Sequence, residues 1–337
     1  MLLRNKIIVG VLFFVTLPLL GKQFPLCLYG VNNPADLQQI KDAGFSCIQT
    51  YQTDPAKLEP LAQKAQEVGL KVVFSPNKVL GTPYEQKAQK WPILAWYLVD
   101  EPDVKRWSRE QVQEKHRAAK QAFPHHMTTL VIGRGNTRIP YYDIPDAMMV
   151  DWYPVPHLEL TSFGEHVLYT KEGLAKTDMQ DHPLWGVVQI FDWKNFKQHR
   201  PDNDRIGRFP TEEEIRFMSY DGILNGATGL FYFTFNHQGD ILPNSAPQYW
   251  QRVQSVVREL ARFKKIFEEG ILVPNPVKVS KRLAMQTWQY QEALYSVLLN
   301  PTDSAKRLPK GLDAFEVLNG PEKGKYIAPY HVLLLKK

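Results

Sequence analysis

The stretch Ile93-Leu-Ala-Trp-Tyr-Leu-Val-Asp100-Glu-Pro-Asp-Val-Lys-Arg-Trp-Ser108-Arg-Glu-Gln111 contains the unit from which the fold of this 337-residue chain is predicted. Ile93–Asp100 is almost continuously apolar, which is typical of a parallel strand buried on both faces. Ser108 and Gln111 have the spacing of a capping box, which marks the start of a helix. The stretch therefore predicts a strand, an acidic loop and a helix, in that order.

The same unit recurs along residues 24–268. Seven further apolar runs are expected to be strands: Phe24–Val31, Cys47–Gln52, Lys71–Asn77, Thr128–Gly133, Ala147–Val155, Leu184–Phe191 and Gly229–Phe235. Between them, Asn33-Pro34 and Asp54-Pro55 each place a capping residue before a proline at the first helical position. Eight strands that alternate with helices over this length predict a (β/α)8 TIM barrel, which usually has about 250 residues. A doubly wound sheet is the competing fold, but no strand is followed by its Gly-x-Gly-x-x-Gly turn.

The pattern changes after residue 270. A last helix is expected over Gln248–Phe267, and four short alternating runs follow, separated by turn residues: Leu283–Gln289, Ala293–Leu299, Phe315–Leu318 and Tyr330–Leu335. The sequence therefore predicts two domains, a barrel over residues 22–270 and a small antiparallel β domain over residues 271–337.

The first 21 residues have the pattern of an export signal. Arg4 and Lys6 precede the apolar segment Ile7–Leu20, which is shorter than the roughly 20 residues that a membrane-spanning helix requires. We expect a signal peptide and a secreted or periplasmic protein. Because the residues around Gly21 match a cleavage site only in part, an uncleaved membrane anchor remains the alternative.

Composition and charge narrow the class of protein. Apolar residues make up 44% and charged residues 23% of the chain, the balance of a folded globular protein rather than a disordered or multi-span membrane protein. The net charge is +6, but beyond the leader the cations alternate with acids, which argues against a nucleic-acid partner. Cys27 and Cys47 lie in apolar runs and are expected to be buried thiols, although an exported protein can oxidise such a pair. No Cys/His spacing is typical of a metal site, and neither a metal nor a cofactor is predicted.

In a (β/α)8 barrel the active site lies at the carboxyl ends of the strands. Three carboxylates at these positions are the catalytic candidates: Glu101, Asp151 and Asp192. The expected substrate contacts are polar or aromatic residues at the same ends: Tyr29, Tyr51, Asn77, Asp100, Trp152, Tyr153, Gln189, Trp193, Tyr232 and Asn236. By contrast, Trp91, Trp96 and Trp185 are expected to pack in the core.

Carboxylates beside aromatic rings suit the cleavage of a glycosidic bond. One carboxylic acid protonates the leaving oxygen, and a second carboxylate attacks the anomeric carbon or activates water. Glu101 is the best candidate for the acid, because it directly follows an apolar strand and partial burial raises the pKa of a carboxyl group. The alternative is that the acidic residues 100–103 only cap the next helix.

The segment Trp96–Asp103 resembles the Asn-Glu-Pro segment of clan A glycoside hydrolases, with Asp100 in place of the asparagine. Asp151-Trp-Tyr-Pro, Leu184–Phe191, Pro210–Met218 and Gly226–Phe233 are similar to stretches of uncharacterised secreted bacterial barrels of glycosidase type. The resemblance implies that Glu101 is the general acid/base. It also implies a nucleophilic Glu at the end of the seventh strand, but this sequence has Gln189 within that run and Asp192 as the first carboxylate after it.

Two classes of function follow. The first is an exported glycoside hydrolase that acts on an oligo- or polysaccharide, either with Asp192 or Asp151 as the second carboxylate or by an inverting or substrate-assisted reaction. The second is a non-catalytic protein for carbohydrate binding or envelope polysaccharide assembly. The separation between the Glu101 carboxyl and those of Asp151 and Asp192 discriminates them. About 5–5.5 Å favours retention, about 6.5–9.5 Å favours inversion, and no second carboxylate within that range favours the binding protein.

Overall fold

The computed structural model describes residues 23–135, 138–196, 207–237, 239–320 and 324–337. The expected export signal, residues 1–21, lies outside these ranges. Among the described residues, no helix combines the length and apolar character needed to cross a membrane.

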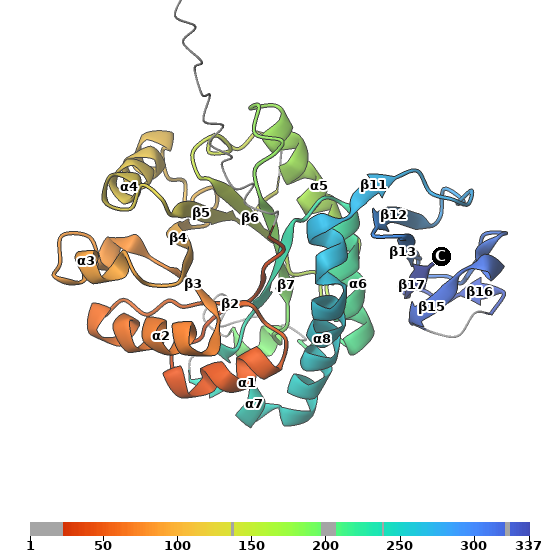
Figure 1. Cartoon of the computed structure of the whole chain (residues 1–337), viewed down its shortest axis with the longest axis horizontal. Coiled ribbons are helices and arrows are strands. Elements are labelled where there is room, and N and C mark those ends of the chain that lie inside the picture. The colour runs from red at the N-terminus through yellow and green to blue at the C-terminus, as the bar shows by residue number, and fades with distance from the viewer. Residues whose placement is uncertain (1–22, 136–137, 197–206, 238, 321–323) are drawn as a thin grey trace, which may run out of the picture.

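Eight parallel strands form a closed barrel (Figure 1). They are β1 (Leu26–Leu28), β2 (Cys47–Gln49), β3 (Lys71–Phe74), β4 (Ile93–Asp100), β5 (Met127–Ile132), β6 (Ala147–Asp151), β7 (Leu184–Gln189) and β8 (Gly229–Phe233). Each strand pairs with the next, and β8 pairs with β1 to close the ring. The predicted (β/α)8 barrel is therefore confirmed.

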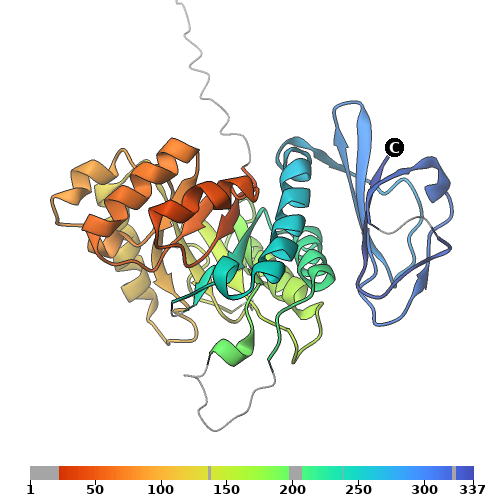
Figure 2. The ribbon, with the colours of Figure 1, turned by 90° about the horizontal axis from the view of Figure 1, so that it is seen from below.

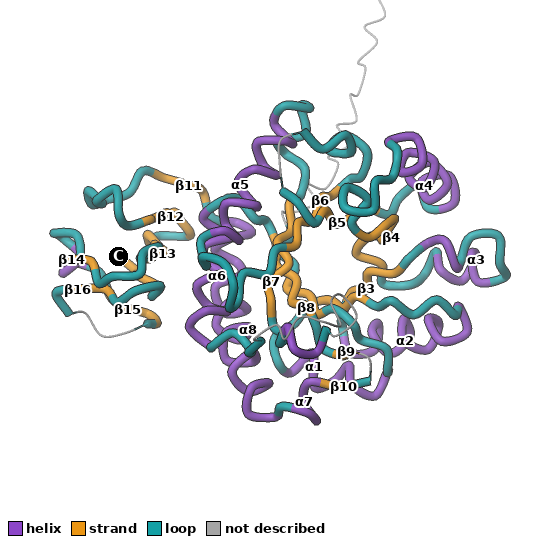
Figure 3. The backbone as a smooth tube through the Cα atoms, turned by 180° about the vertical axis from the view of Figure 1, so that it is seen from behind, coloured by secondary structure: helices purple, strands orange, loops and turns teal. Residues whose placement is uncertain are grey.

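Helices surround the strands, as Figure 3 shows. They are α1 (Leu37–Asp42), α2 (Pro55–Val68), α3 (Tyr84–Ala88), α4 (Arg109–Ala122), α5 (Ser162–Ala175), α6 (Glu212–Leu224), α7 (Leu242–Ser245) and α8 (Pro247–Glu269), with the short 3-10 helices η1 (Pro34–Asp36), η2 (Pro76–Lys78) and η3 (Trp193–Asn195). The predicted caps are present: Asn33 and Asp54 each accept a hydrogen bond from the backbone two residues on. Ser108 forms its capping box with Gln111.

Strand side chains alternate between the barrel interior and the layer beneath the helices. Trp185 faces inward and stacks on Phe231 with ring centres 5.3 Å apart, whereas Trp96 packs outward on Phe123 at 4.4 Å. Both side chains are buried, as is Trp91, so their assignment to packing is confirmed.

Several strands are shorter than the apolar runs that predicted them. β1 ends at Leu28 and β6 at Asp151, although the runs continue to Val31 and Val155. Most of the additional residues are loop residues that are also buried, Val31 and Val155 among them, whereas Trp152 and Tyr153 are only partly buried. An apolar run therefore marks burial here, not the extent of the ladder.

The prediction of two free thiols is wrong. Cys27 and Cys47 are both buried, but they form a disulfide bond. The barrel register places the two residues directly opposite each other on β1 and β2, with Cα atoms 4.4 Å apart, inside the range that a disulfide bridges. This register is a tertiary feature that the spacing of two cysteines does not reveal.

The remaining chain forms a small antiparallel β domain, confirming the second part of the predicted fold. One sheet has the order β11 (Ile271–Val273), β12 (Ala284–Tyr290), β13 (Ala293–Leu299), β17 (Val332–Lys336), β15 (Glu316–Asn319), and β14 (Lys306–Arg307) pairs with β16 (Tyr326–Ile327). A short 3-10 helix, η5 (Leu312–Ala314), precedes β15.

The β domain packs beside α6 and α8, to one side of the barrel (Figure 2). The Phe267 ring at the end of α8 meets Trp288 of β12 edge-on at 5.3 Å. A buried ion pair joins Arg216 of α6 to Glu259 of α8, and Arg216 also donates a hydrogen bond to the backbone oxygen of Val332. Because this charged pair contacts both domains, it holds them in one orientation.

We expect the disulfide to stabilise the folded chain by about 3 kcal/mol, the chain-entropy value for a closed loop of this length. Replacing both cysteines with alanine should lower the free energy of unfolding by about this amount in urea denaturation. A reductant should destabilise the wild type and leave the Cys27→Ala/Cys47→Ala variant unchanged. Two titratable thiols in the denatured, unreduced wild type would show that the bond does not form.

Candidate active site

A cavity of about 500 Å³ opens at the carboxyl end of the barrel. Its lining residues follow or end strands β1, β2, β4, β5, β6, β7 and β8: Tyr29, Tyr51, Asp100, Glu101, Val131, Asp151, Tyr153, Phe191, Trp193, Phe196 and Phe233. Seven of the sequence-predicted site residues are among them, including Glu101 and Asp151. The barrel thus brings together carboxylates from β4 and β6 and rings from several loops.

Glu101 stands where β4 ends, in an unusual backbone conformation. Its φ is +46°, in the left-handed region that side chains other than Gly and Asn seldom adopt. Its N–H still donates to the backbone oxygen of Val131 at 3.0 Å, which holds the residue against β5. Directly after β5, Gly133 leaves room for the carboxyl group, because a Cβ there would lie 2.9 Å from Glu101 Oε1. Strain of this kind is commonly retained at functional sites.

Asp100 is held firmly beside Glu101. The Tyr97 hydroxyl donates to its Oδ1 at 2.6 Å, and the Lys105 ammonium lies 2.7 Å from its Oδ2. Lys105 also donates to the backbone oxygen of Asp100 at 2.8 Å. The Lys105 ammonium therefore offsets the negative charge of Asp100, one of the three carboxyl residues that line the cavity.

Asp151, the last residue of β6, is buried with an incomplete set of hydrogen bonds. The Tyr153 hydroxyl donates to Oδ2 at 3.1 Å, whereas Oδ1 is buried and meets no hydrogen-bond donor among the described residues. Burial, followed by the charges of Glu101 and Asp100, raises the pKa of Asp151 well above its usual range. An acceptor in this position is satisfied when a proton is shared with a neighbouring carboxyl group.

Glu101 is that neighbour. Both side chains line the cavity, and the charge of Glu101 is one of the causes that raise the pKa of Asp151. Burial and then the charge of Asp100 raise the pKa of Glu101, while Lys105 and Asp151 oppose the rise. Burial and neighbouring like charges both disfavour the ionised form of a carboxyl group. The site therefore favours protonation of its carboxyl groups at a higher pH than exposed acids require.

Aromatic rings form the walls around these acids. The Tyr29 ring lies 6.0 Å from Tyr51 and 5.6 Å from Phe233, and the Tyr153 ring stacks on Phe233 at 5.6 Å. Burial is the main cause that raises the pKa of Tyr29 and Tyr153 well above the usual value, so both hydroxyls stay protonated as donors. Flat rings with hydroxyl donors suit the apolar faces and hydroxyl groups of a sugar.

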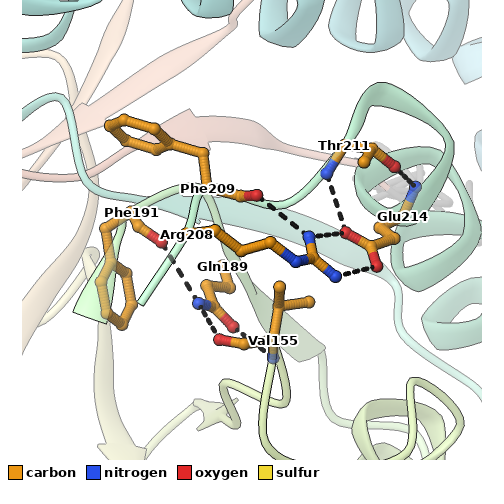
Figure 4. A network of polar contacts seen from close by, with 7 residues as sticks. All are labelled: Val155, Gln189, Phe191, Arg208, Phe209, Thr211 and Glu214. Atoms are coloured by element: carbon orange, nitrogen blue, oxygen red, sulfur yellow. Dashed lines mark hydrogen bonds and ion pairs between the residues drawn. The ribbon is translucent and has the colours of Figure 1, made fainter. Parts of the chain in front are cut away.

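Gln189, predicted to contact substrate, does not line the cavity. Figure 4 shows its buried amide bonded to backbone groups on both sides. It accepts from the Val155 N–H at 2.9 Å and donates to the oxygens of Val155 and Phe191 at 2.8 and 3.2 Å. The amide therefore joins the loop after β6, which carries Tyr153, to the loop after β7, which carries the lining residue Phe191.

Asp192 is also not among the residues that line the cavity. It caps η3, accepting a hydrogen bond from the Lys194 N–H at 2.8 Å. The other predicted contacts that do not line the cavity have partners elsewhere. The Trp152 indole N–H donates to the Ser162 hydroxyl, and Asn77 accepts from Lys115. The Tyr232 hydroxyl contacts that of Ser219 in α6, and Asn236 accepts from the Gly239 N–H.

Sequence reasoning missed the lining residues Val131, Phe191, Phe196 and Phe233. For Phe233 a usable signal exists, because alternate residues of a strand face the same side. Trp185 and Phe231 face the barrel interior, and Phe233 shares the parity of Phe231, whereas Tyr232 has the opposite parity. Phe196 lies beyond β7 in a loop, where no periodicity applies.

Within the described ranges, no group of three or more His, Cys, Asp or Glu side chains is arranged to hold a metal ion. The residues that line the cavity offer carboxyl groups, tyrosine hydroxyls and aromatic rings.

Several solved structures with a similar architecture are glycoside hydrolases. A GH30 endoxylanase from Clostridium papyrosolvens C71 is similar with a TM-score of 0.57 and 12% identity, over 94% of this chain and 96% of that one. The chain has the fold of the glycoside hydrolase barrels. An α-amylase from Geobacillus thermoleovorans, complexed with acarbose, has a TM-score of 0.55 and 11% identity over 94% and 98% of the two chains. A glucosidase from Croceicoccus marinus has a TM-score of 0.53 and 11% identity over 95% and 96%. The sequence matches no protein-family model and no curated protein.

We expect Asp151→Asn to stabilise the protein at neutral pH. Because the pKa of Asp151 is raised in the folded state, its contribution to the stability of the fold is fully present below the ordinary aspartate pKa of about 3.9. This stabilising contribution is lost as pH rises. Asparagine keeps the acceptor for Tyr153 without the buried charge. The melting temperature should rise by about 2–4 °C at pH 7, and the difference should shrink towards pH 4.

The matched control is Asp192→Asn, because asparagine is as good a helix cap as aspartate and the side chain lies outside the cavity. Its melting temperature should follow that of the wild type at both pH values. The melting temperature of Asp151→Asn is compared with that of the wild type at each pH. If this difference is lower at pH 7 than at pH 4, the assigned burial of a charge at Asp151 is wrong.

Proposed function

We propose that this protein hydrolyses O-glycosidic bonds of an oligo- or polysaccharide, with Glu101 as general acid/base. The observation that carries the proposal is that Glu101 and Asp151 line one cavity with aromatic walls, where burial raises the pKa of both carboxyl groups. General acid catalysis requires a carboxylic acid that is still protonated near neutral pH. The glycoside hydrolase fold supports the same assignment at the level of architecture.

In the proposed reaction the sugar lies against the aromatic walls and Glu101 protonates the leaving oxygen. Burial and the charge of Asp100 favour the protonated form of Glu101. Asp151, which lines the same cavity, is the candidate for the second carboxylate, and attack by water or by a group of the substrate is the alternative. The stereochemistry of the product distinguishes retention from inversion.

A second candidate function is carbohydrate binding without hydrolysis. It is favoured by the end of β7, where Gln189 is fully bonded to backbone and Asp192 caps η3. Among the described residues, no carboxylate from β7 lines the cavity. Calorimetric binding of glycans that the wild type leaves intact would support this function and contradict the first.

We expect Glu101→Gln to lower the rate of hydrolysis by about 10²–10⁴-fold, because the amide cannot transfer a proton. The loss should be largest for natural glycans and smaller for aryl glycosides, whose leaving groups need little protonation. Glycan binding should survive, since the amide still forms hydrogen bonds. The measurement is a rate comparison over a panel of glycans and aryl glycosides, with product anomers followed by NMR.

The control for this experiment is Glu110→Gln, an exposed glutamate in the first turn of α4. It should retain wild-type rates. If Glu101→Gln folds normally and hydrolyses a natural glycan as fast as the wild type, Glu101 is not the acid, and Asp100 or a carboxylate of another strand must take that role.

We also propose that the protein is exported and acts in the periplasm or outside the cell. The apolar leader with Arg4 and Lys6 supports this, as does the Cys27–Cys47 disulfide, since disulfides persist in oxidising compartments. Amino-terminal sequencing of the fractionated protein tests it. A chain that starts near Lys22 outside the cytoplasm is expected, and an intact leader in the cytosol would refute it.

A further inference from the structure

The charges of the two domains differ in sign. Residues 23–270 contain 28 lysines and arginines against 30 aspartates and glutamates, whereas residues 271–337 contain ten against five. The small β domain therefore carries most of the net positive charge, and the barrel is slightly acidic. Such asymmetry indicates a surface for an anionic partner.

The cations of the β domain gather around two neighbouring loops. Val277 packs with Leu308 in one hydrophobic cluster, and a Cβ on Gly311 would lie 3.3 Å from Val277. These loops and the β14–β16 pair carry six exposed cations, here called the basic face: Lys278, Lys281, Arg282, Arg307, Lys310 and Lys325. Within the described parts of the chain, none of the six forms an ion pair.

A hollow of about 360 Å³ lies between the two loops. It is lined by Lys278, Val279, Ser280 and Lys310, so two ammonium groups and a hydroxyl border one open space. A carboxylate or phosphate group that enters it meets positive charge from both sides. Asp313 in η5 lies three residues after Lys310 in the chain and makes no ion pair with it.

An exposed aromatic ring adjoins these cations. Tyr326 on β16 pairs directly with Arg307 on β14, so their side chains stand next to each other on one face. The Tyr326 side chain is 62% exposed. A flat ring beside a guanidinium group suits a sugar ring that bears a negative charge, since the ring contacts the apolar sugar face and the cation pairs with the anion.

We propose that the basic face binds an anionic polysaccharide and thereby anchors the protein to it. The barrel cavity is unsuited to the same polymer, because Asp100, Glu101 and Asp151 line it and no lysine or arginine does so among the described residues. The anchoring polymer and any glycan processed in the barrel are therefore different molecules. This inference does not depend on the proposed hydrolysis.

The test is the binding of polygalacturonate, a polysaccharide with a carboxylate on each sugar, to the mature full chain. We expect binding that weakens with rising salt and no binding of neutral dextran. The triple variant Lys278→Gln/Arg307→Gln/Lys310→Gln should bind about 10-fold or more weakly, because each exposed ion pair adds a modest contribution. Tyr326→Ala should also weaken binding while leaving the charge unchanged.

The control variant Lys57→Gln/Lys90→Gln/Lys176→Gln removes three exposed lysines from the barrel for the same change in net charge. It should bind like the wild type. Equal weakening by the two triple variants would overturn the proposal, because binding would then follow net charge alone. The absence of binding to polygalacturonate would also overturn the proposal. Vesicles that contain phosphatidylglycerol are tested in parallel, and binding to these vesicles alone would assign the basic face to a membrane surface instead.

Discussion

Closure of the barrel by the pairing of β1 with β8 is the constraint on which the rest of the structure depends. A closed ring of parallel strands directs every strand's carboxyl end to the same opening. Glu101 after β4 and Asp151 at the end of β6 are 50 residues apart in the chain, yet closure brings both side chains to one cavity. Closure likewise sets Cys27 opposite Cys47 inside the barrel.

The cavity gathers the carboxyl groups of Asp100, Glu101 and Asp151. Lys105 balances Asp100, and the Tyr153 hydroxyl supports Asp151, but one Asp151 oxygen has no donor among the described residues. Burial raises the pKa of both Glu101 and Asp151, which favours their protonated forms. An amide at position 151 would avoid the buried charge, which is why the catalytic proposal rests on these acids.

The end of β7 shows that a shared fold does not imply a shared set of catalytic residues. The three solved barrels compared above come from glycoside hydrolases, yet at identities near one residue in ten the likeness concerns the fold. Where the resemblance in sequence implies a nucleophilic glutamate, Gln189 instead joins the loops after β6 and β7 through three backbone hydrogen bonds. The catalytic proposal rests on the acids of β4 and β6 for this reason.

Local sequence determined much of this protein. Apolar runs, capping boxes and capping residues before prolines are properties of short segments, and they predicted the eight strands, the helix starts and the antiparallel β domain. They also placed Glu101 and Asp151 at strand ends, since polar residues after an apolar run mark where a strand stops. Tertiary structure alone decided which strand-end residues meet. The direction of a side chain past a strand end depends on loop conformation and on partners far along the chain, so Asp192 turned to cap η3 and Phe196 entered the cavity lining. The disulfide had the same origin, because the register of β1 against β2 is set by closure of the whole ring and by no segment within it.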